Sequence, residues 1–124
     1  MKTEEAEGGT LETWTPDEVR AGMERGEVVL VDVRTPQEYA FEHVPGALLM
    51  PMHEVGDAVI PGDADGQRIV FHCAAGARSE RVAKAALSRG RGAVAHMGGG
   101  FKAWKEAKLP TVAIDPATGA PKRP

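Results

Sequence analysis

Residues 68–79, which read RIVFHCAAGARS, decide both the fold and the chemistry expected of this chain. The apolar run that ends at His72 is typical of a buried strand, and the small residues after it are typical of a tight loop. A helix-like stretch, residues 80–89, follows. Strand, small-residue loop and helix together point successive backbone N–H groups at one atom. We expect that atom to be the sulfur of Cys73, the only cysteine in the sequence.

Cys73 is therefore a candidate nucleophile. Backbone N–H groups and a helix N-terminus favour a thiolate over a thiol. A single cysteine after a strand can also be an inert, buried side chain. The small loop residues and Arg78 favour the reactive form, because a guanidinium is too costly to bury unpaired beside an inert sulfur.

Length and composition indicate one soluble domain. The 124 residues suit a single core, and 42% hydrophobic with 27% charged residues is ordinary for a globular protein. No apolar run reaches 18 residues, so neither a transmembrane helix nor a membrane partner is expected. Residues 1–7 are acidic and lack the apolar core of a signal peptide. One free thiol suits a reducing compartment, so a cytoplasmic location is expected.

The net charge of −3 is unevenly distributed. Residues 67–92 contain six basic residues and one acidic residue, whereas the rest of the chain contains nine basic and seventeen acidic residues. Such a positive segment would attract small anions. For Arg81, Lys84 and Ser88 the solvated face of a helix is the preferred interpretation, and Arg78 in the loop is the exception. A nucleic-acid partner is not expected, because basic and aromatic residues do not interleave.

Helices and strands are predicted to alternate along the chain. Thr15 and Thr35 each begin a Thr-Pro-x-Glu sequence that is typical of a capped helix start, and Gly26 would end the first helix. Strands are expected over residues 28–33, 47–50, 69–72 and 93–97, and further helices over 36–42, 52–59, 80–89 and 101–108. The expected domain spans residues 10–112, between disordered segments 1–9 and 113–124.

This alternation predicts an α/β domain with a mainly parallel sheet. In such sheets the reactive loop lies at the carboxyl ends of the strands. Cys73 follows a predicted strand directly, so it falls at that edge.

Four motifs follow one another along the chain. They are Val31-Asp32-Val33-Arg34 with Glu38-Tyr39, then His43-Val44-Pro45-Gly46-Ala47, then Cys73 to Arg78 as Cys-x-x-Gly-x-Arg, and finally Gly98-Gly99-Gly100-Phe101-Lys102-Ala103-Trp104. In this order they resemble the motifs of the single-domain rhodanese family of sulfurtransferases. The resemblance covers residues 11–109. The sequence departs from the family pattern at Glu42, where the family commonly has glycine. This departure affects the expected conformation of the local turn and not the chemistry.

The resemblance implies a fold, a reaction and a set of site residues. The fold would be a five-stranded, mainly parallel sheet with helices on both faces. Cys73 would be the catalytic residue, taking the outer sulfur of a small anionic donor such as thiosulfate as a persulfide and passing it to a thiol, cyanide or a protein acceptor. No metal and no cofactor would be needed. The substrate-binding residues would be Ala74, Ala75, Gly76, Ala77, Arg78 and Ser79, and the structural motif residues would be Asp32, Arg34, His43 and Gly99.

Some of these roles have alternatives. Asp32 and Arg34 would share one face of a strand, so an ion pair or loop caps explain them without substrate contact. His72 would point away from Cys73, which favours a packing role over a general base. The sequence contains four histidines, His43, His53, His72 and His96. Their spacing relative to Cys73 matches no known pattern of zinc ligands.

Two other functions compete with sulfur transfer. Relatives of this fold that act as phosphatases or arsenate reductases carry five residues between the cysteine and the arginine, whereas four separate Cys73 from Arg78. The shorter loop should be too small for phosphate. Non-catalytic interaction modules of this fold usually lack the cysteine, so the presence of Cys73 disfavours that function.

Overall fold

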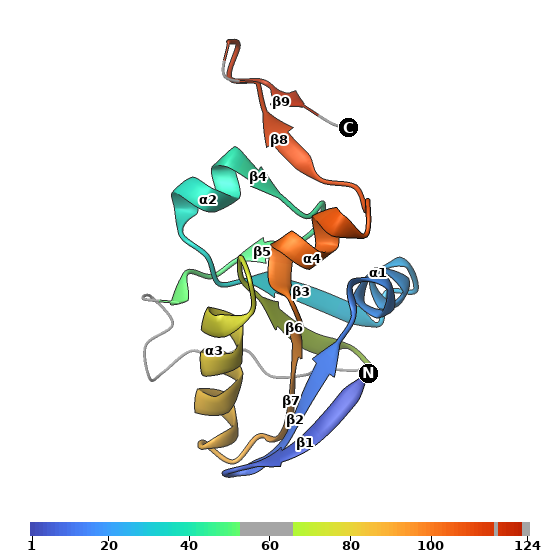
Figure 1. The fold of residues 1–124 in the computed structure, drawn as a ribbon, viewed down its shortest axis with the longest axis vertical. Helices are drawn as coiled ribbons and strands as arrows, with labels where there is room; N and C mark the ends of the chain where they lie inside the picture. The colour runs from blue at the N-terminus through green and yellow to red at the C-terminus, as the bar shows by residue number, and fades with distance from the viewer. Residues whose placement is uncertain (53–65, 116, 123–124) are drawn as a thin grey trace.

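A six-stranded sheet forms the centre of the computed structural model, which describes residues 1–52, 66–115 and 117–122. The strands lie in the order β1-β2-β7-β6-β3-β5 (Figure 1). Their bounds are β1 Lys2–Ala6, β2 Gly9–Trp14, β3 Val28–Asp32, β5 Leu48–Leu49, β6 Arg68–His72 and β7 Gly92–Met97. Five of them run parallel, and β1 adds to the edge antiparallel to β2. The predicted mainly parallel α/β fold is confirmed, with one additional strand.

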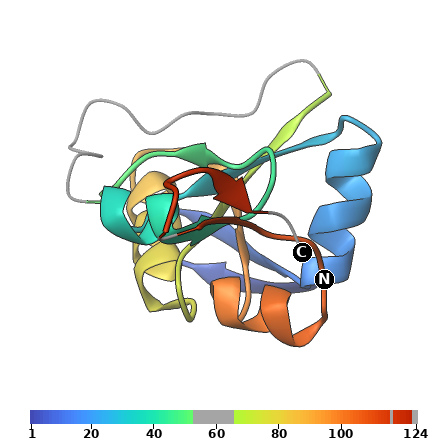
Figure 2. The same cartoon turned by 90° about the horizontal axis from the view of Figure 1, so that it is seen from above.

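The helices cover both faces of the sheet (Figures 1 and 2). They are α1 Pro16–Glu24, α2 Pro36–Phe41, α3 Ala77–Leu87 and α4 Gly100–Glu106. Side chains of α3 such as Val82 and Leu87 pack into one buried cluster, which also contains Cys73. Val19 of α1 and Trp104 of α4 pack into a second cluster. The hydrophobic effect therefore holds α3 on one face and α1 with α4 on the other.

The predicted helix starts are present. Thr15 and Thr35 each accept a hydrogen bond from a backbone N–H three residues on, and Glu18 and Glu38 complete the two capping boxes. Gly26, with φ +71°, follows the end of α1, a position where glycine is favoured because it lacks a Cβ. The helix expected over residues 52–59 lies, except for its first residue, outside the described residues.

Residues 1–9, for which disorder is expected, contain a strand in the structure. Lys2–Ala6 forms β1, paired along its whole length with β2. Backbone hydrogen bonds hold this strand, so the sequence needs few apolar side chains there. The hairpin turn requires glycine, because a Cβ on Gly8 would lie 2.3 Å from the carbonyl oxygen of Leu87.

The described part of residues 113–124, for which disorder is also expected, contributes to two short strands. A small second sheet, in the order β4-β8-β9, consists of β4 Glu42–His43, β8 Val112–Ile114 and β9 Pro121–Lys122.

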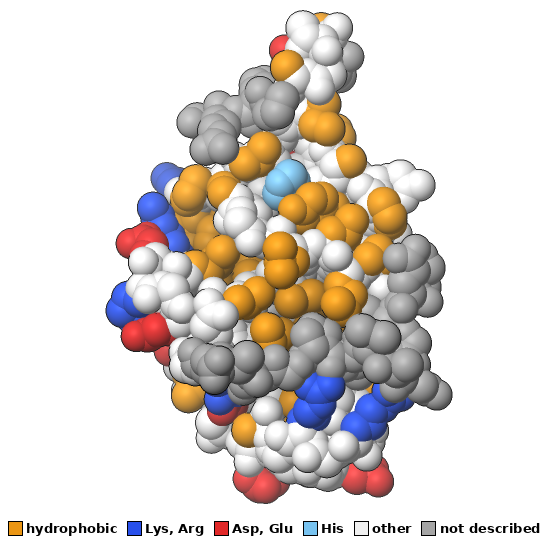
Figure 3. Space-filling view, turned by 180° about the vertical axis from the view of Figure 1, so that it is seen from behind, with side chains coloured by type: hydrophobic (Ala, Val, Ile, Leu, Met, Phe, Trp, Pro, Cys, Tyr) orange, Lys and Arg blue, Asp and Glu red, His pale blue; other side chains and the backbone are white. Residues whose placement is uncertain are grey.

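Hydrophobic side chains gather on the back of the molecule (Figure 3). Among the large hydrophobic side chains of the described residues, Phe41 and Leu48 are the most exposed, at 72% and 58%. None of the described helices is both long enough and apolar enough to span a bilayer.

Candidate active site

Cys73 follows β6 directly and is only 1% exposed. Its sulfur accepts a hydrogen bond from the backbone N–H of Gly76 at 3.0 Å, and the hydroxyl oxygen of Ser79 lies 3.6 Å away. The backbone N–H groups of Ala75 and Ser79 also help to lower the pKa of Cys73. The predicted arrangement of donors around Cys73 is therefore present, and we call residues 73–79 the cysteine loop.

Opposing effects set the pKa of Cys73. Burial raises it, because a thiolate is poorly solvated inside the protein. Hydrogen bonds from the backbone and hydroxyl of Ser79, and from the backbone of Gly76 and Ala75, lower it and outweigh burial. The net result is a pKa below the ordinary value for cysteine, which favours the nucleophilic thiolate.

Helix α3 begins inside the cysteine loop, at Ala77 and not at residue 80 as the sequence indicated. Gly76 occupies the N-cap position with φ +112°, a conformation that L side chains rarely adopt. This early start places the backbone N–H of Ser79 in the first helical turn, where it has no partner within the helix. This free N–H group helps to lower the pKa of Cys73.

The first turn of α4 holds the cysteine loop from behind. The backbone N–H of Phe101 donates to the carbonyl of Cys73 at 2.7 Å, and that of Lys102 donates to the carbonyl of Ala74 at 2.9 Å. This approach requires glycine, because a Cβ on Gly100 would lie 2.4 Å from the oxygen of Cys73. Gly99 is equally constrained, because its Cβ would lie 2.6 Å from the Cβ of Ala103.

Arg78 has a partner that the sequence analysis did not assign. Its guanidinium makes a two-pronged ion pair with Glu38 of α2, at 2.8 and 2.9 Å. This hydrogen-bonded pair lowers the pKa of Glu38 to about 2. Both side chains are about one-third exposed, at 30% and 33%. Because Glu38 already pairs with Arg78, the presence of Arg78 does not by itself favour a reactive Cys73, and the contact of Arg78 with substrate stays a prediction.

Asp32 and Arg34 form the ion pair that the strand spacing allowed. Both side chains are buried, and the closest contact is 2.8 Å. Arg34 also donates to the carbonyl of Glu42 at 2.7 Å and lies 4.4 Å from the ring centre of Phe101. These contacts tie β3 to β4 and α4, which is a structural role.

The unusual Glu42 is accommodated in extended backbone, with φ −163°. Its carboxylate accepts hydrogen bonds from Lys105 at 2.8 Å and Thr111 at 2.7 Å. A glutamate at this position therefore links β4 to α4 and to the segment before β8.

His43 and His72 lie in separate environments. His43 stacks on Tyr39 with ring centres 3.8 Å apart. His72 is fully buried, with Nε2 3.5 Å from a carboxylate oxygen of Asp32, and burial lowers its pKa. His53 lies outside the described residues, and within the described part of the chain no three His, Cys, Asp or Glu side chains gather as metal ligands.

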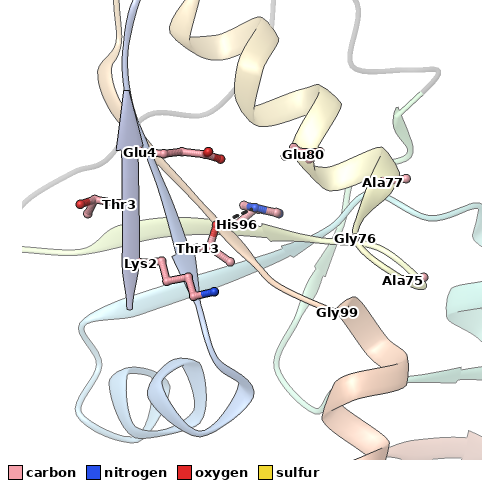
Figure 4. Close-up of a pocket in the computed structure, with 10 residues that line it drawn as sticks. All are labelled: Lys2, Thr3, Glu4, Thr13, Ala75, Gly76, Ala77, Glu80, His96 and Gly99. Atoms are coloured by element: carbon pink, nitrogen blue, oxygen red, sulfur yellow. Dashed lines mark hydrogen bonds between the residues drawn. The ribbon is translucent and has the colours of Figure 1, made fainter. Parts of the chain in front are cut away.

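Sequence reasoning missed a role for His96 beside the cysteine loop. Nδ1 of His96 lies 3.3 Å from the hydroxyl of Ser79, and Nε2 lies 3.1 Å from the hydroxyl of Thr13. His96 also lines a pocket of about 620 Å³ between β1 and the start of α3 (Figure 4). The pairing of β2 with β7 places Thr13 opposite His96. A prediction of β2 from the sequence could have indicated this contact, but β2 was not predicted.

Comparison with known proteins identifies the family. The model of the rhodanese-like domain family matches residues 15–107, which is most of the chain. The protein belongs to the rhodanese-like family.

Sequence relatives include named sulfurtransferases. A sulfurtransferase of Allochromatium vinosum is 40% identical over 70% of this chain and 80% of its own length. The thiosulfate sulfurtransferase GlpE of Pseudomonas fluorescens is 34% identical over 73% of this chain and 81% of its own length. An uncharacterized protein of Synechocystis, slr1261, is 34% identical over 81% of this chain, which spans 55% of that longer protein. These relatives support a sulfurtransferase of the rhodanese type.

Solved structures share the fold. A rhodanese-related protein of Thermoplasma volcanium superimposes with a TM-score of 0.69 at 21% identity, covering 82% of this chain and 97% of that one. A Rhodopseudomonas palustris protein described as a possible tyrosine phosphatase has a TM-score of 0.67 at 32% identity, covering 80% and 83%.

The contact between α4 and the cysteine loop predicts a stability difference between two glycine substitutions. Gly90→Ala places a side chain at positive φ with nothing within 4 Å, and it should cost about 1 kcal/mol of unfolding free energy. Gly100→Ala adds the clash with Cys73 and should cost roughly 3 kcal/mol or more. Urea unfolding of both variants measures the difference, and equal losses would contradict the close approach.

The ion pair of Glu38 with Arg78 predicts a pH-dependent contribution to stability. Glu38→Gln keeps an acceptor for the N-cap of α2 but removes the charge, so at pH 7 it should cost about 0.5–1 kcal/mol. The carboxylate pKa is lowered from 4.5 to about 2 on folding, so the contribution is complete above pH 4.5 and is lost as pH falls towards 2. Urea unfolding between pH 3 and 7 should show the two proteins converging at low pH. A constant difference would contradict the pairing.

Proposed function

We propose that this protein moves a sulfane sulfur through a persulfide on Cys73. The observation that carries the proposal is the buried sulfur with the N–H of Gly76 at 3.0 Å and a lowered pKa. The thiolate attacks the outer sulfur of a donor, the S–S bond of the donor breaks, and its remaining anion leaves. A thiol or cyanide then attacks the outer sulfur and regenerates the Cys73 thiolate, so one difficult transfer becomes two easier ones.

Thiosulfate is the proposed donor class, and the name of the GlpE relative supports it. The N–H groups of the cysteine loop would hold the terminal sulfur of the persulfide as they hold the thiolate. Ala75 and Ala77 are exposed and small, so they leave room for the donor and for a thiol acceptor, including one carried by a protein. Arg78, positioned by Glu38 at the start of α3, would contact the oxygens of the donor. We place this chemistry in the reducing cytoplasm.

Phosphate-ester hydrolysis is a second candidate, which the description of the Rhodopseudomonas palustris neighbour favours. The four residues between Cys73 and Arg78 oppose it. The N–H groups of so short a loop already converge on the sulfur, with Gly76 at 3.0 Å. A tetrahedral oxyanion needs a wider ring of donors.

Mass spectrometry tests the sulfur-transfer proposal directly. Incubation with thiosulfate should make the intact protein one sulfur atom heavier, and cyanide should remove that mass and release thiocyanate. Cys73→Ser should abolish both, because the sequence contains no other thiol. Sulfur loading that persists in Cys73→Ser would exclude the mechanism.

Loop length predicts the outcome of a phosphatase assay. The unmodified protein should hydrolyse aryl phosphates weakly or not at all, whereas insertion of one glycine after Ala75 should widen the loop and increase hydrolysis. A matched insertion after Gly90, in an open surface turn, serves as the control for general perturbation. Efficient hydrolysis by the unmodified protein would reverse the order of the two candidate functions.

A further inference from the structure

A line of hydrogen-bonding groups leads away from the sulfur of Cys73. The hydroxyl of Ser79 lies 3.6 Å from the sulfur, Nδ1 of His96 lies 3.3 Å from that hydroxyl, and the hydroxyl of Thr13 lies 3.1 Å from Nε2 of the same ring. We propose that His96 accepts the thiol proton of Cys73 through the hydroxyl of Ser79 and releases it into the pocket beside the cysteine loop. The inference rests on the proposed function only in its use of the thiolate as nucleophile.

Four separate elements bring these groups together. Cys73 directly follows β6, Ser79 lies in the first turn of α3, and β7 and β2 pair so that His96 is opposite Thr13. Ser79 is fully buried and His96 is 6% exposed. The hydroxyl of Ser79 is therefore shielded from bulk water between the sulfur and the imidazole.

The proton transfer balances without any co-reactant. The S–H bond of Cys73 breaks as an O–H bond forms on Ser79. The original hydroxyl proton of Ser79, for which the carbonyl of Gly76 at 3.2 Å is a second acceptor, forms an N–H bond at Nδ1 of His96. The products are a thiolate, an unchanged serine and an imidazolium. The proton on Nε2 then passes to water in the pocket, with the hydroxyl of Thr13 as the neighbouring hydrogen-bond partner.

The surroundings of His96 suit a base. Burial lowers its pKa, so the ring is neutral and able to accept a proton at pH 7. Glu80 of α3 and Glu4 of β1 oppose this effect, and Lys84 of α3 adds to it. Lys2 of β1 also lines the pocket, as Figure 4 shows. The two carboxylates stabilise the imidazolium once it forms.

His96 acts through Ser79 and is therefore a positioning residue, so its test needs a readout that packing alone would not change. That readout is the pH dependence of Cys73 alkylation by iodoacetamide, which is uncharged and involves no sulfur donor. His96→Asn should slow alkylation at pH 7 about tenfold while keeping the wild-type limiting rate at high pH, as expected for a pKa higher by about one unit. His43→Asn is the matched control, because His43 stacks on Tyr39, and it should retain the wild-type profile.

A double-mutant cycle tests whether the two residues act in series. Ser79→Ala should slow alkylation at pH 7 at least as much as His96→Asn, and the double variant should be no slower than Ser79→Ala alone. Losses that multiply, or a wild-type pH profile in a folded His96→Asn variant, would overturn the proposal. A failure here leaves the sulfur-loading assay unaffected, so it is distinguishable from failure of the proposed function.

A measurement on the unmutated protein keeps the test independent of folding. Titration of the His96 ring by ¹⁵N NMR should show a lower pKa after Cys73 is alkylated, because the thiolate that stabilises the imidazolium has been removed. An identical titration before and after alkylation would contradict the relay.

Discussion

The direction of the peptide groups in the cysteine loop is the constraint on which the rest of the structure depends. A loop that turns its N–H groups toward one sulfur must turn carbonyls away from it, and those carbonyls need donors when they are buried. The backbone N–H groups of Phe101 and Lys102 are those donors, because they bind the carbonyls of Cys73 and Ala74. Helix α4 must therefore start against the loop, which is why Gly100 can carry no side chain.

The two arginine pairs extend this constraint to the outer elements. Arg34 connects the buried Asp32 to the backbone of Glu42 and to the ring of Phe101, so β3, β4 and α4 hold one another in place. Arg78 connects the start of α3 to Glu38 in the short helix α2. The first pair thus acts on the cysteine loop through α4, and the second belongs to the loop itself.

Local chemistry made much of this predictable. Capping sequences, a β-branched strand and a small-residue loop after a strand are signals contained within a few residues, and α1, β3 and the position of Cys73 follow from them. The strands β1 and β8 were not predictable in this way. The backbones of their partner strands hold β1 at the edge of the main sheet and β8 in the small second sheet, and neither has an alternating apolar pattern of its own. Helix α3 starts at Ala77, next to the hydrogen bond from the N–H of Gly76 to the sulfur of Cys73. No helix-start signal in the sequence marks this position.

Side-chain partners across the fold were the least predictable part. The pairing of Arg78 with Glu38 joins residues 40 positions apart, and that of His96 with Thr13 joins residues 83 positions apart. Each pair can be predicted only once the topology is known. The contact of His96 with Thr13 was missed because β2 was not predicted.

The same ion pairs change how the site stabilises negative charge. The sequence predicted a positive segment that attracts anions, yet at least three of its cations pair with acidic residues in the described part of the chain: Arg68 with Glu12, Arg78 with Glu38 and Lys84 with Glu80. Paired cations contribute a weak field at a distance. The sulfur of Cys73 is instead stabilised at close range by neutral dipoles, the N–H groups of its own loop and the hydroxyl of Ser79. Such dipoles act on a thiolate and on a persulfide alike, because both place their negative charge on sulfur within the loop. The fixed backbone of the cysteine loop, and not the net charge around it, is therefore what lowers the pKa of Cys73.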